Sequence, residues 1–214
     1  SSLLFTDNHY SDILIARNKW VEGGHLVIRN MSYIDGIPNY NIIIRANKLY
    51  DSQNHAIGLD NAADILVENN IVQNGASNGI RLYGTNTDLQ IVNNRISRCQ
   101  YAGIQIEKSE YVYPPLTDGI IEAVDNELEE NGYGIILSDV ENCYIHNNDI
   151  EDNTQIGIHA TANSANNLIE DLEIRGNGVF DVLDESTGYG TAGTANTWNR
   201  IEGSRCSPDG ICVD

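Results

Sequence analysis

Short runs of alternating apolar and polar residues recur along the whole chain, and each run is bounded by Asn, Asp or Gly. One kind of run begins with Asn or Asp, as in Asp12–Ile15 and Asp88–Ile91. A second kind follows a glycine, as in Gly79–Leu82 and Gly134–Leu137. β-Branched residues at a period of two, interrupted by turn residues, are typical of short strands. No stretch keeps apolar residues at helical spacing for three turns, so the pattern predicts an all-β protein.

The runs belong to a repeating unit that reads Asn-x-apolar, a second Asn, and then Gly-Ile. Asn126 and Asn148 open two successive units and are 22 positions apart. The glycines of the same two units, Gly134 and Gly157, are 23 positions apart. Self-similarity at such a period is the signature of a repeat architecture. Units of this length with two or three short strands each predict a parallel β-solenoid, here of about eight rungs.

The recurring asparagines have a structural explanation. Asn tolerates turn conformations, and stacked Asn side chains can bond from one rung to the next. We therefore expect a ladder of asparagines rather than a binding site. The predicted ladder consists of Asn47, Asn69, Asn94, Asn126 and Asn148.

The unit Asn-x-Ile-x-x-Asn…Gly-Ile resembles the repeats of the right-handed parallel β-helices of the pectin-lyase-like superfamily. The resemblance extends from about Asp12 to Val213, so it implies one parallel β-helix domain over residues 1–214. The superfamily includes pectate lyases, polygalacturonases, mannuronan C5-epimerases and non-catalytic surface proteins, so the fold does not by itself define an activity. The residues from Ser1 read as the middle of a strand, so we expect a fragment or processed product with an open N-terminal end.

The charge balance excludes two classes of partner. The chain has 31 acidic and 12 basic residues, a formal net charge of −19 and a pI near 4.3. A nucleic-acid-binding protein would carry a basic patch, and an anionic membrane surface would repel this chain. No apolar run is long enough for a membrane-spanning helix, so neither nucleic-acid binding nor membrane insertion is expected.

The four cysteines point to an exported protein. Cys206 and Cys212 lie close together on either side of Pro208–Gly210, and we expect them to form a disulfide. Cys99 and Cys143 are expected to be unpaired, and none of the four has the spacing of a zinc site. We therefore predict an extracellular or cell-surface location, no metal site and no cofactor, with Ca²⁺ as the one cation considered.

An enzyme that acts on a uronate-containing glycan, as a lyase or C5-epimerase, is one functional hypothesis. It needs a cation to neutralise the carboxylate and a base to take the C5 proton. Arg81 is the candidate cation, Tyr83 or Lys108 the candidate base, and His159 lies in the same outward column. The family's catalytic signatures are absent: the polygalacturonase motifs Asn-Thr-Asp, Asp-Asp, His-Gly and Arg-Ile-Lys, and the epimerase motif Tyr-Gly-x-Asp-Pro-His.

Glycan binding without turnover is a second hypothesis. Tyr111 and Tyr113 lie in an insertion that lengthens one rung, and insertions in a solenoid go to loops on one face, often the binding face. Aromatic rings there could stack on a sugar. The ordinary alternative is a solvated loop beside a solvated column.

The hypothesis that the sequence favours is a non-catalytic structural solenoid that assembles with itself into a fibre or sheath. The outward positions of the first strand in each rung are largely apolar, which is unusual for a solvated sheet face and marks interfaces. Solenoid ends without caps could also stack. The outward pairs are Leu14 and Ala16, Ile43 and Arg45, Leu66 and Glu68, Gln90 and Val92, Glu122 and Val124, and Tyr144 and His146.

Overall fold

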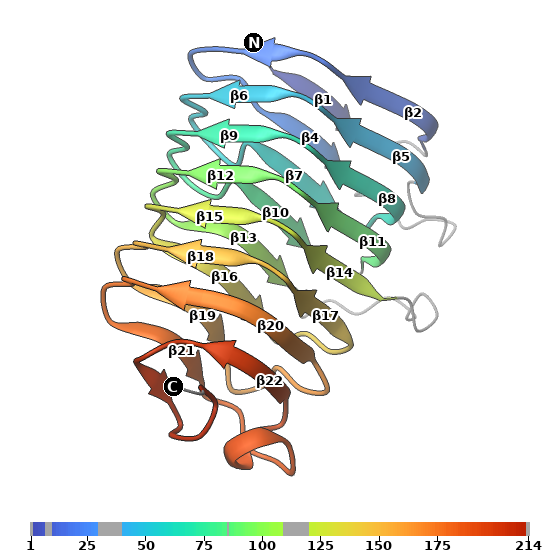
Figure 1. The fold of residues 1–214 in the computed structure, drawn as a ribbon. Helices are drawn as coiled ribbons and strands as arrows, with labels where there is room; N and C mark the ends of the chain where they lie inside the picture. Colours follow the sequence, from blue (N-terminus) through green and yellow to red (C-terminus); the bar gives the residue numbers. More distant parts are fainter. Residues whose placement is uncertain (1, 7–9, 30–39, 85, 109–119, 213–214) are drawn as a thin grey trace.

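The computed structural model describes residues 2–6, 10–29, 40–84, 86–108 and 120–212. Within them the chain winds as a parallel β-helix, in which every strand pairs in parallel with the equivalent strand of the next rung (Figure 1). The described residues contain no helix long and apolar enough to cross a membrane. The predicted all-β, parallel β-helix class is confirmed.

The strands form three faces, which we number by the strand that begins each. Face 1 is a nine-stranded sheet in the described residues. Its strands are β1 (Leu3–Thr6), β4 (Leu26–Arg29), β7 (Ile57–Asp60), β10 (Ile80–Tyr83), β13 (Ala102–Glu107), β16 (Tyr133–Ser138), β19 (Ile156–Ala160), β21 (Phe180–Asp184) and β23 (Cys206–Ser207).

Faces 2 and 3 meet in β20 (Leu168–Arg175), which pairs with β17 on one face and with β18 on the other. Face 2 contains β2 (Ser11–Ala16), β5 (Tyr40–Arg45), β8 (Ala63–Glu68), β11 (Thr87–Val92), β14 (Ile121–Val124), β17 (Cys143–His146) and β22 (Thr197–Glu202). Face 3 contains β3 (Lys19–Trp20), β6 (Lys48–Tyr50), β9 (Ile71–Gln73), β12 (Arg95–Ser97), β15 (Glu127–Glu129) and β18 (Asp149–Glu151). One short 3₁₀ turn, Thr191–Gly193, precedes β22.

Aliphatic side chains from the three faces fill the interior in stacks. On face 1 the stack that contains Ile80 continues to Ile104 and Ile135, and all three are fully buried. The alternation of each strand sends every second side chain inward and the others to the surface. Because the register is in step from rung to rung, the outward residues also form straight columns.

A ladder of buried asparagines runs along the turn between faces 2 and 3. Each Asn accepts, through its side-chain oxygen, hydrogen bonds from the backbone N–H and side-chain amide of the Asn one rung earlier, as Asn148 does from Asn126 at 3.0 and 2.9 Å. The amide also donates to a strand carbonyl, which leaves few buried polar groups unpaired. The ladder begins at Asn18, which is exposed, and continues through the buried Asn47, Asn70, Asn94, Asn126 and Asn148.

Asn69 is not in this ladder, and its prediction was wrong. The pairing of Lys48 with Ile71 places Asn70 opposite Asn47. Asn69 is exposed, has a φ of 55°, and accepts a hydrogen bond from Asn93 in a second, external row. Two consecutive asparagines could each fill the repeat position, and only the rung register distinguishes them.

The recurring glycine at the start of face 1 is required by close packing. A Cβ atom on Gly134 would lie 2.4 Å from a methyl of Ile150 and 2.5 Å from the carbonyl oxygen of Gly157. Gly79, Gly103 and Gly157 have similar contacts of 2.3 to 2.9 Å with the next rung. The glycine therefore lets the following rung stack at strand distance.

The last rungs are closed by polar groups and a disulfide. Cys206 and Cys212 are bonded, as predicted, whereas Cys99 and Cys143 are free and buried. The buried Asp184 accepts hydrogen bonds from the backbone and hydroxyl of Ser186, the amide of Asn196 and the indole of Trp198. These four bonds tie β21 to the loop before β22 and to β22 itself.

Candidate functional site

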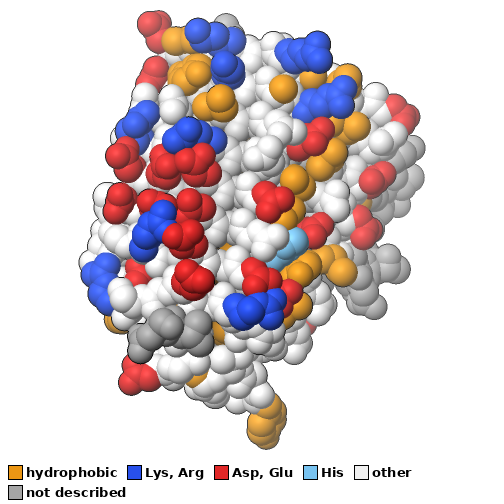
Figure 2. All heavy atoms as spheres, viewed as in Figure 1, with side chains coloured by type: hydrophobic (Ala, Val, Ile, Leu, Met, Phe, Trp, Pro, Cys, Tyr) orange, Lys and Arg blue, Asp and Glu red, His pale blue; other side chains and the backbone are white. Residues whose placement is uncertain are grey.

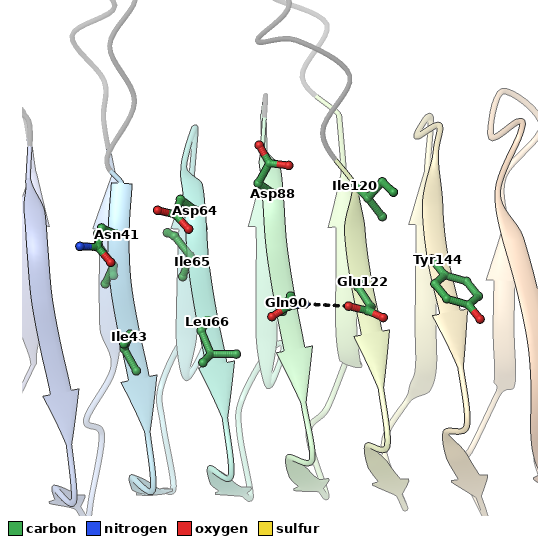
Figure 3. Close-up of a pocket in the computed structure, with 11 residues that line it drawn as sticks. Asn41, Ile43, Asp64, Ile65, Leu66, Asp88, Gln90, Ile120, Glu122 and Tyr144 are labelled. Atoms are coloured by element: carbon green, nitrogen blue, oxygen red, sulfur yellow. Dashed lines mark hydrogen bonds between the residues drawn. The ribbon is translucent and has the colours of Figure 1, made fainter.

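The outward surface of face 2 is hollowed into a continuous groove. The first hollow has a volume of about 550 Å³ and is lined from β5 to β17 (Figure 3). A second of about 490 Å³ shares Ile120 and Tyr144 with it, and a third of about 590 Å³ shares Asn166 and Leu168 with the second. The groove crosses the strands from β5 to β22, a span of about 29 Å at the usual strand spacing.

The floor of the groove is the middle outward column of face 2. The register places Ile43 beside Leu66, Leu66 beside Gln90, Gln90 beside Glu122, and Glu122 beside Tyr144. Apolar side chains therefore occupy one end, and the polar pair Gln90 and Glu122 interrupts them (Figure 3). The outward direction of these side chains agrees with the sequence, but the apolar stripe is not continuous, as the mixed colours of Figure 2 also show.

One wall of the groove is a row of Asp and Asn residues at the start of the strands. Asn41, Asp64 and Asp88 line it, with φ of 53°, 53° and 49°. Asn and Asp enter this left-handed region more readily than other non-glycine residues, which explains why they repeat here. Asp64 and Asp88 are exposed, so their carboxylates face solvent along the groove.

Glu122 and Tyr144 hold fixed positions in the groove. Glu122 accepts a hydrogen bond from the Gln90 amide at 2.9 Å and contacts Nε2 of His146 at 2.9 Å. The Tyr144 ring stacks on His146 with centroids 4.1 Å apart, and its hydroxyl donates to Glu170 at 2.6 Å. The hydrogen bond to the Glu170 carboxylate raises the pKa of Tyr144, with burial and nearby acids adding to the effect. Tyr144 therefore stays a neutral ring at physiological pH.

The charge of the groove has one sign. Asp64, Asp88 and Glu122 line the first hollow, and among the residues that the structure describes no Lys or Arg lines any of the three hollows. At the far end Tyr189 is fully exposed. The surface thus combines carboxylates, amides, an apolar floor and two tyrosines spaced along one line.

The candidate catalytic residues lie on face 1 or directly after one of its strands, and the structure brings Arg81 and Tyr83 together but places His159 apart from them. Arg81 pairs with Glu107 at 2.9 Å and lies over the Tyr83 ring at 4.5 Å, so its charge is already neutralised. His159 is on β19, three strands away from β10, and contacts Glu185 at 3.1 Å. Lys108 follows β13 and is exposed. Tyr111 and Tyr113 lie outside the described residues.

The sequence did not single out the residues of the groove wall as a site, and it named Tyr144 only as an outward residue of the apolar stripe. The signal that was available is the recurrence of Asp or Asn at the first position of the strand runs, at Asp12, Asn41, Asp64 and Asp88. We interpreted these residues as strand boundaries only. Glu107, which neutralises Arg81, was likewise not predicted as its partner.

The fold and the groove define a parallel β-helix protein with an elongated surface site. The chain belongs to the family described as periplasmic copper-binding protein (NosD), whose model matches residues 17–202. Its structure is similar to the A-module of the mannuronan C-5 epimerase AlgE4 from Azotobacter vinelandii, with a TM-score of 0.66, 19% identity and 89% of this chain covered. The chain spans about half of that module, 51%. No curated protein matches the chain significantly.

The family description names the periplasm, and the disulfide fits an oxidising compartment of that kind. It also names copper, but the described residues do not fit a copper site. No group of three or more His, Cys, Asp or Glu side chains among them is placed to hold a metal ion. Burial raises the pKa of the Cys99 thiol to about 11 and that of Cys143 to about 12, so neither is the thiolate that a soft metal needs.

Proposed function

We propose that this protein is an exported, non-catalytic β-helix that binds a glycan chain along the groove of face 2. The observation that carries the proposal is the shape of the site. A groove that crosses seven strands in one direction fits an extended polymer, and its amides, carboxylates and rings are groups that bind hydroxyl-rich ligands. We place the protein, as part of this proposal, in the periplasm or at the cell surface.

A polypeptide fits this groove less well. Extended peptides gain most of their affinity from the free backbone groups of a sheet edge, and helical peptides from a deep apolar groove. The groove lies on the face of a sheet whose backbone groups are already paired, so only side chains are available to a ligand. Tyr144 and Tyr189 supply ring faces for stacking, which a sugar can use.

The absence of turnover is supported by the arrangement of face 1. Arg81 is paired with Glu107. His159 lies three strands away from Arg81 and is paired with Glu185. The AlgE4 module acts on mannuronan by its name, but the likeness to it concerns the fold alone. We therefore propose binding to a glycan, not epimerisation or cleavage.

Titration calorimetry with a panel of short neutral, amine-bearing and uronate oligosaccharides tests the proposal. Tyr144→Ala should weaken binding by roughly tenfold, the typical effect of removing a central aromatic contact. Tyr50→Ala on face 3 is the matched control and should bind as the parent does. Chromatography of the oligosaccharides after incubation should show unchanged chain length. If no oligosaccharide binds, the proposal is rejected.

Self-association is the second candidate function, favoured by Leu14, which is 56% exposed at the end of the same column. Two copies that met through face 2 would oppose Asp64 and Asp88 of each, so the contact would need high salt to screen them. Light scattering over a concentration series in high salt tests this. A mass that stays monomeric at every concentration rejects it, and Leu14→Glu should abolish any association that is seen.

A further inference from the structure

The carboxylates on the groove wall have few hydrogen-bond or ion-pair partners among the described residues. Among the described residues, no hydrogen bond or ion pair is found for the Asp64 carboxylate, and Asp88 has only a 3.4 Å contact with the hydroxyl of Thr87. Arg45 lies at the C-terminal end of β5, on the same outward face as Ile43, and it pairs with Glu68 at 4.0 Å. Asp64 and Asp88 are therefore available to a bound cation or donor.

The third carboxylate, Glu122, differs from these two. It already accepts from Gln90 and contacts His146, and its side chain is 25% exposed. With both contacts made, the Glu122 side chain still lines the first hollow, where it lies on the floor between Gln90 and Tyr144. The hollow thus places two exposed carboxylates on its wall, neither of them paired with a cation of the described residues, and one carboxylate held by Gln90 and His146 on its floor.

We propose that the groove selects amino-sugar glycans whose amines are protonated, and rejects uronate glycans. This inference rests on the proposed glycan binding and names its ligand class. A protonated amine can donate charge-assisted hydrogen bonds to Asp64 and Asp88, whereas a uronate carboxylate would meet three like charges and no Lys or Arg among the described residues that line the hollow. The apolar floor of Ile43 and Leu66 contacts the ring faces of the sugars, and Tyr144 stacks on the next unit.

The wall positions are also suited to a clean test. Asp64 and Asp88 have left-handed backbone conformations that Asn adopts as readily, so Asp→Asn removes the charge without straining the turn. Asp125 and Asp139 are at similar conformations, with φ of 53° and 57°, and do not line the groove. The pair Asp125→Asn with Asp139→Asn therefore matches the charge loss of Asp64→Asn with Asp88→Asn.

The experiment compares three oligosaccharides of equal length by calorimetry: polyglucosamine, its fully N-acetylated form and an oligouronate. We expect the amine form to bind about tenfold more tightly than the N-acetylated form, a preference that high salt removes, and the uronate not to bind. Asp64→Asn with Asp88→Asn should reduce the affinity for the amine form by about five- to tenfold and leave the N-acetylated form unchanged. The matched pair should change neither.

Three results would overturn the inference, and each is separate from failure of the proposed function. If the amine and N-acetylated forms bound equally, and the variant with Asp64→Asn and Asp88→Asn bound both as the parent does, the groove would bind glycans without discriminating between them by charge. Binding of the uronate form would contradict the sign of the selection. Oligolysine supplies positive charge without a sugar. If it bound as tightly as the amine form of the oligosaccharide, the sugar would not be what the groove recognises. Absence of binding to all three oligosaccharides would reject the proposed function itself.

Discussion

Individual asparagines in this chain have opposite roles even when they are neighbours. Asn70 is 1% exposed and makes hydrogen bonds to both adjacent rungs, whereas Asn69 points to solvent from the next position. A buried donor or acceptor that loses its partner costs about 1–3 kcal/mol, so the two residues should respond very differently to replacement.

We predict that Asn70→Ala lowers the free energy of unfolding by about 3 kcal/mol, because it leaves the N–H of Asn47 and the carbonyl of Ile44 without partners. Asn69→Gly, which keeps the left-handed backbone free of strain, should cost less than about 1 kcal/mol. Urea denaturation measures both. Equal losses for the two variants would contradict the assignment of the ladder.

The pair of carboxyls Asp149 and Glu151 on face 3 should titrate abnormally. Burial raises the pKa of Glu151 above the usual 4.5, and the Asp149 carboxylate raises it further against the opposing effect of Arg175. Asp149 Oδ1 is buried and has no hydrogen-bond partner among the described residues. A carboxyl whose pKa is raised by folding disfavours the folded state once the pH rises above its unfolded pKa.

Asp149→Asn should therefore lower the pKa of Glu151 and reduce the stability lost between acid and neutral pH by less than about 1 kcal/mol, since Glu151 is partly exposed. Carbon NMR of the Glu151 carboxyl against pH reads the pKa directly. Asp152→Asn, one residue beyond β18, serves as the control. An unchanged Glu151 titration in the Asp149 variant would exclude the proposed coupling.

At the scale of strands, the glycines of face 1 set how closely rungs stack. Gly134→Ala should destabilise the protein by about 3 kcal/mol or more, because the new Cβ overlaps both a methyl and a backbone carbonyl of the next rung. Gly58→Ala is the control: its Cβ would meet only the Val27 methyls at 3.6 and 3.8 Å. Thermal unfolding compares the two. A Gly134 variant as stable as the Gly58 variant would show that the rungs can separate at little cost.

The strands were predictable from sequence to a greater extent than the site. Asp64–Val67 and Gly79–Leu82 could be recognised as strands because their alternation and flanking turn residues are local signals. The groove depends on which outward columns lie beside each other and on how deep the surface between them is. Both are decided by the insertions and by the register of the rungs. Arg81 illustrates the limit: its type suggested a ligand for uronate, but Glu107 is its partner only because two rungs align.

For the molecule as a whole, the excess of negative charge should oppose folding. A net charge of −19 creates self-repulsion that salt screens within about one Debye length. Raising NaCl from low to physiological ionic strength should stabilise the protein by about 1 kcal/mol, roughly 2–4 °C in melting temperature at this size. The same series near the pI of 4.3 is the control and should show little effect. A salt effect of equal size there would mean that repulsion is not its cause.

In this β-helix, the residues that hold the rungs together are not the residues that line the groove. Gly134 and Asn70 fix the spacing and register of the rungs from positions that do not line the groove.

The left-handed corner at the start of β2, β5, β8 and β11 on face 2 has an evolutionary consequence. Asp and Asn occupy that corner interchangeably, as Asp12, Asn41 and Asp64 already do in consecutive coils. Exchanging one for the other alters the charge presented to a ligand and leaves the backbone as it was. Descendants of such a protein could change their preferred polymer one coil at a time, because each exchange alters one charge and keeps the same backbone conformation.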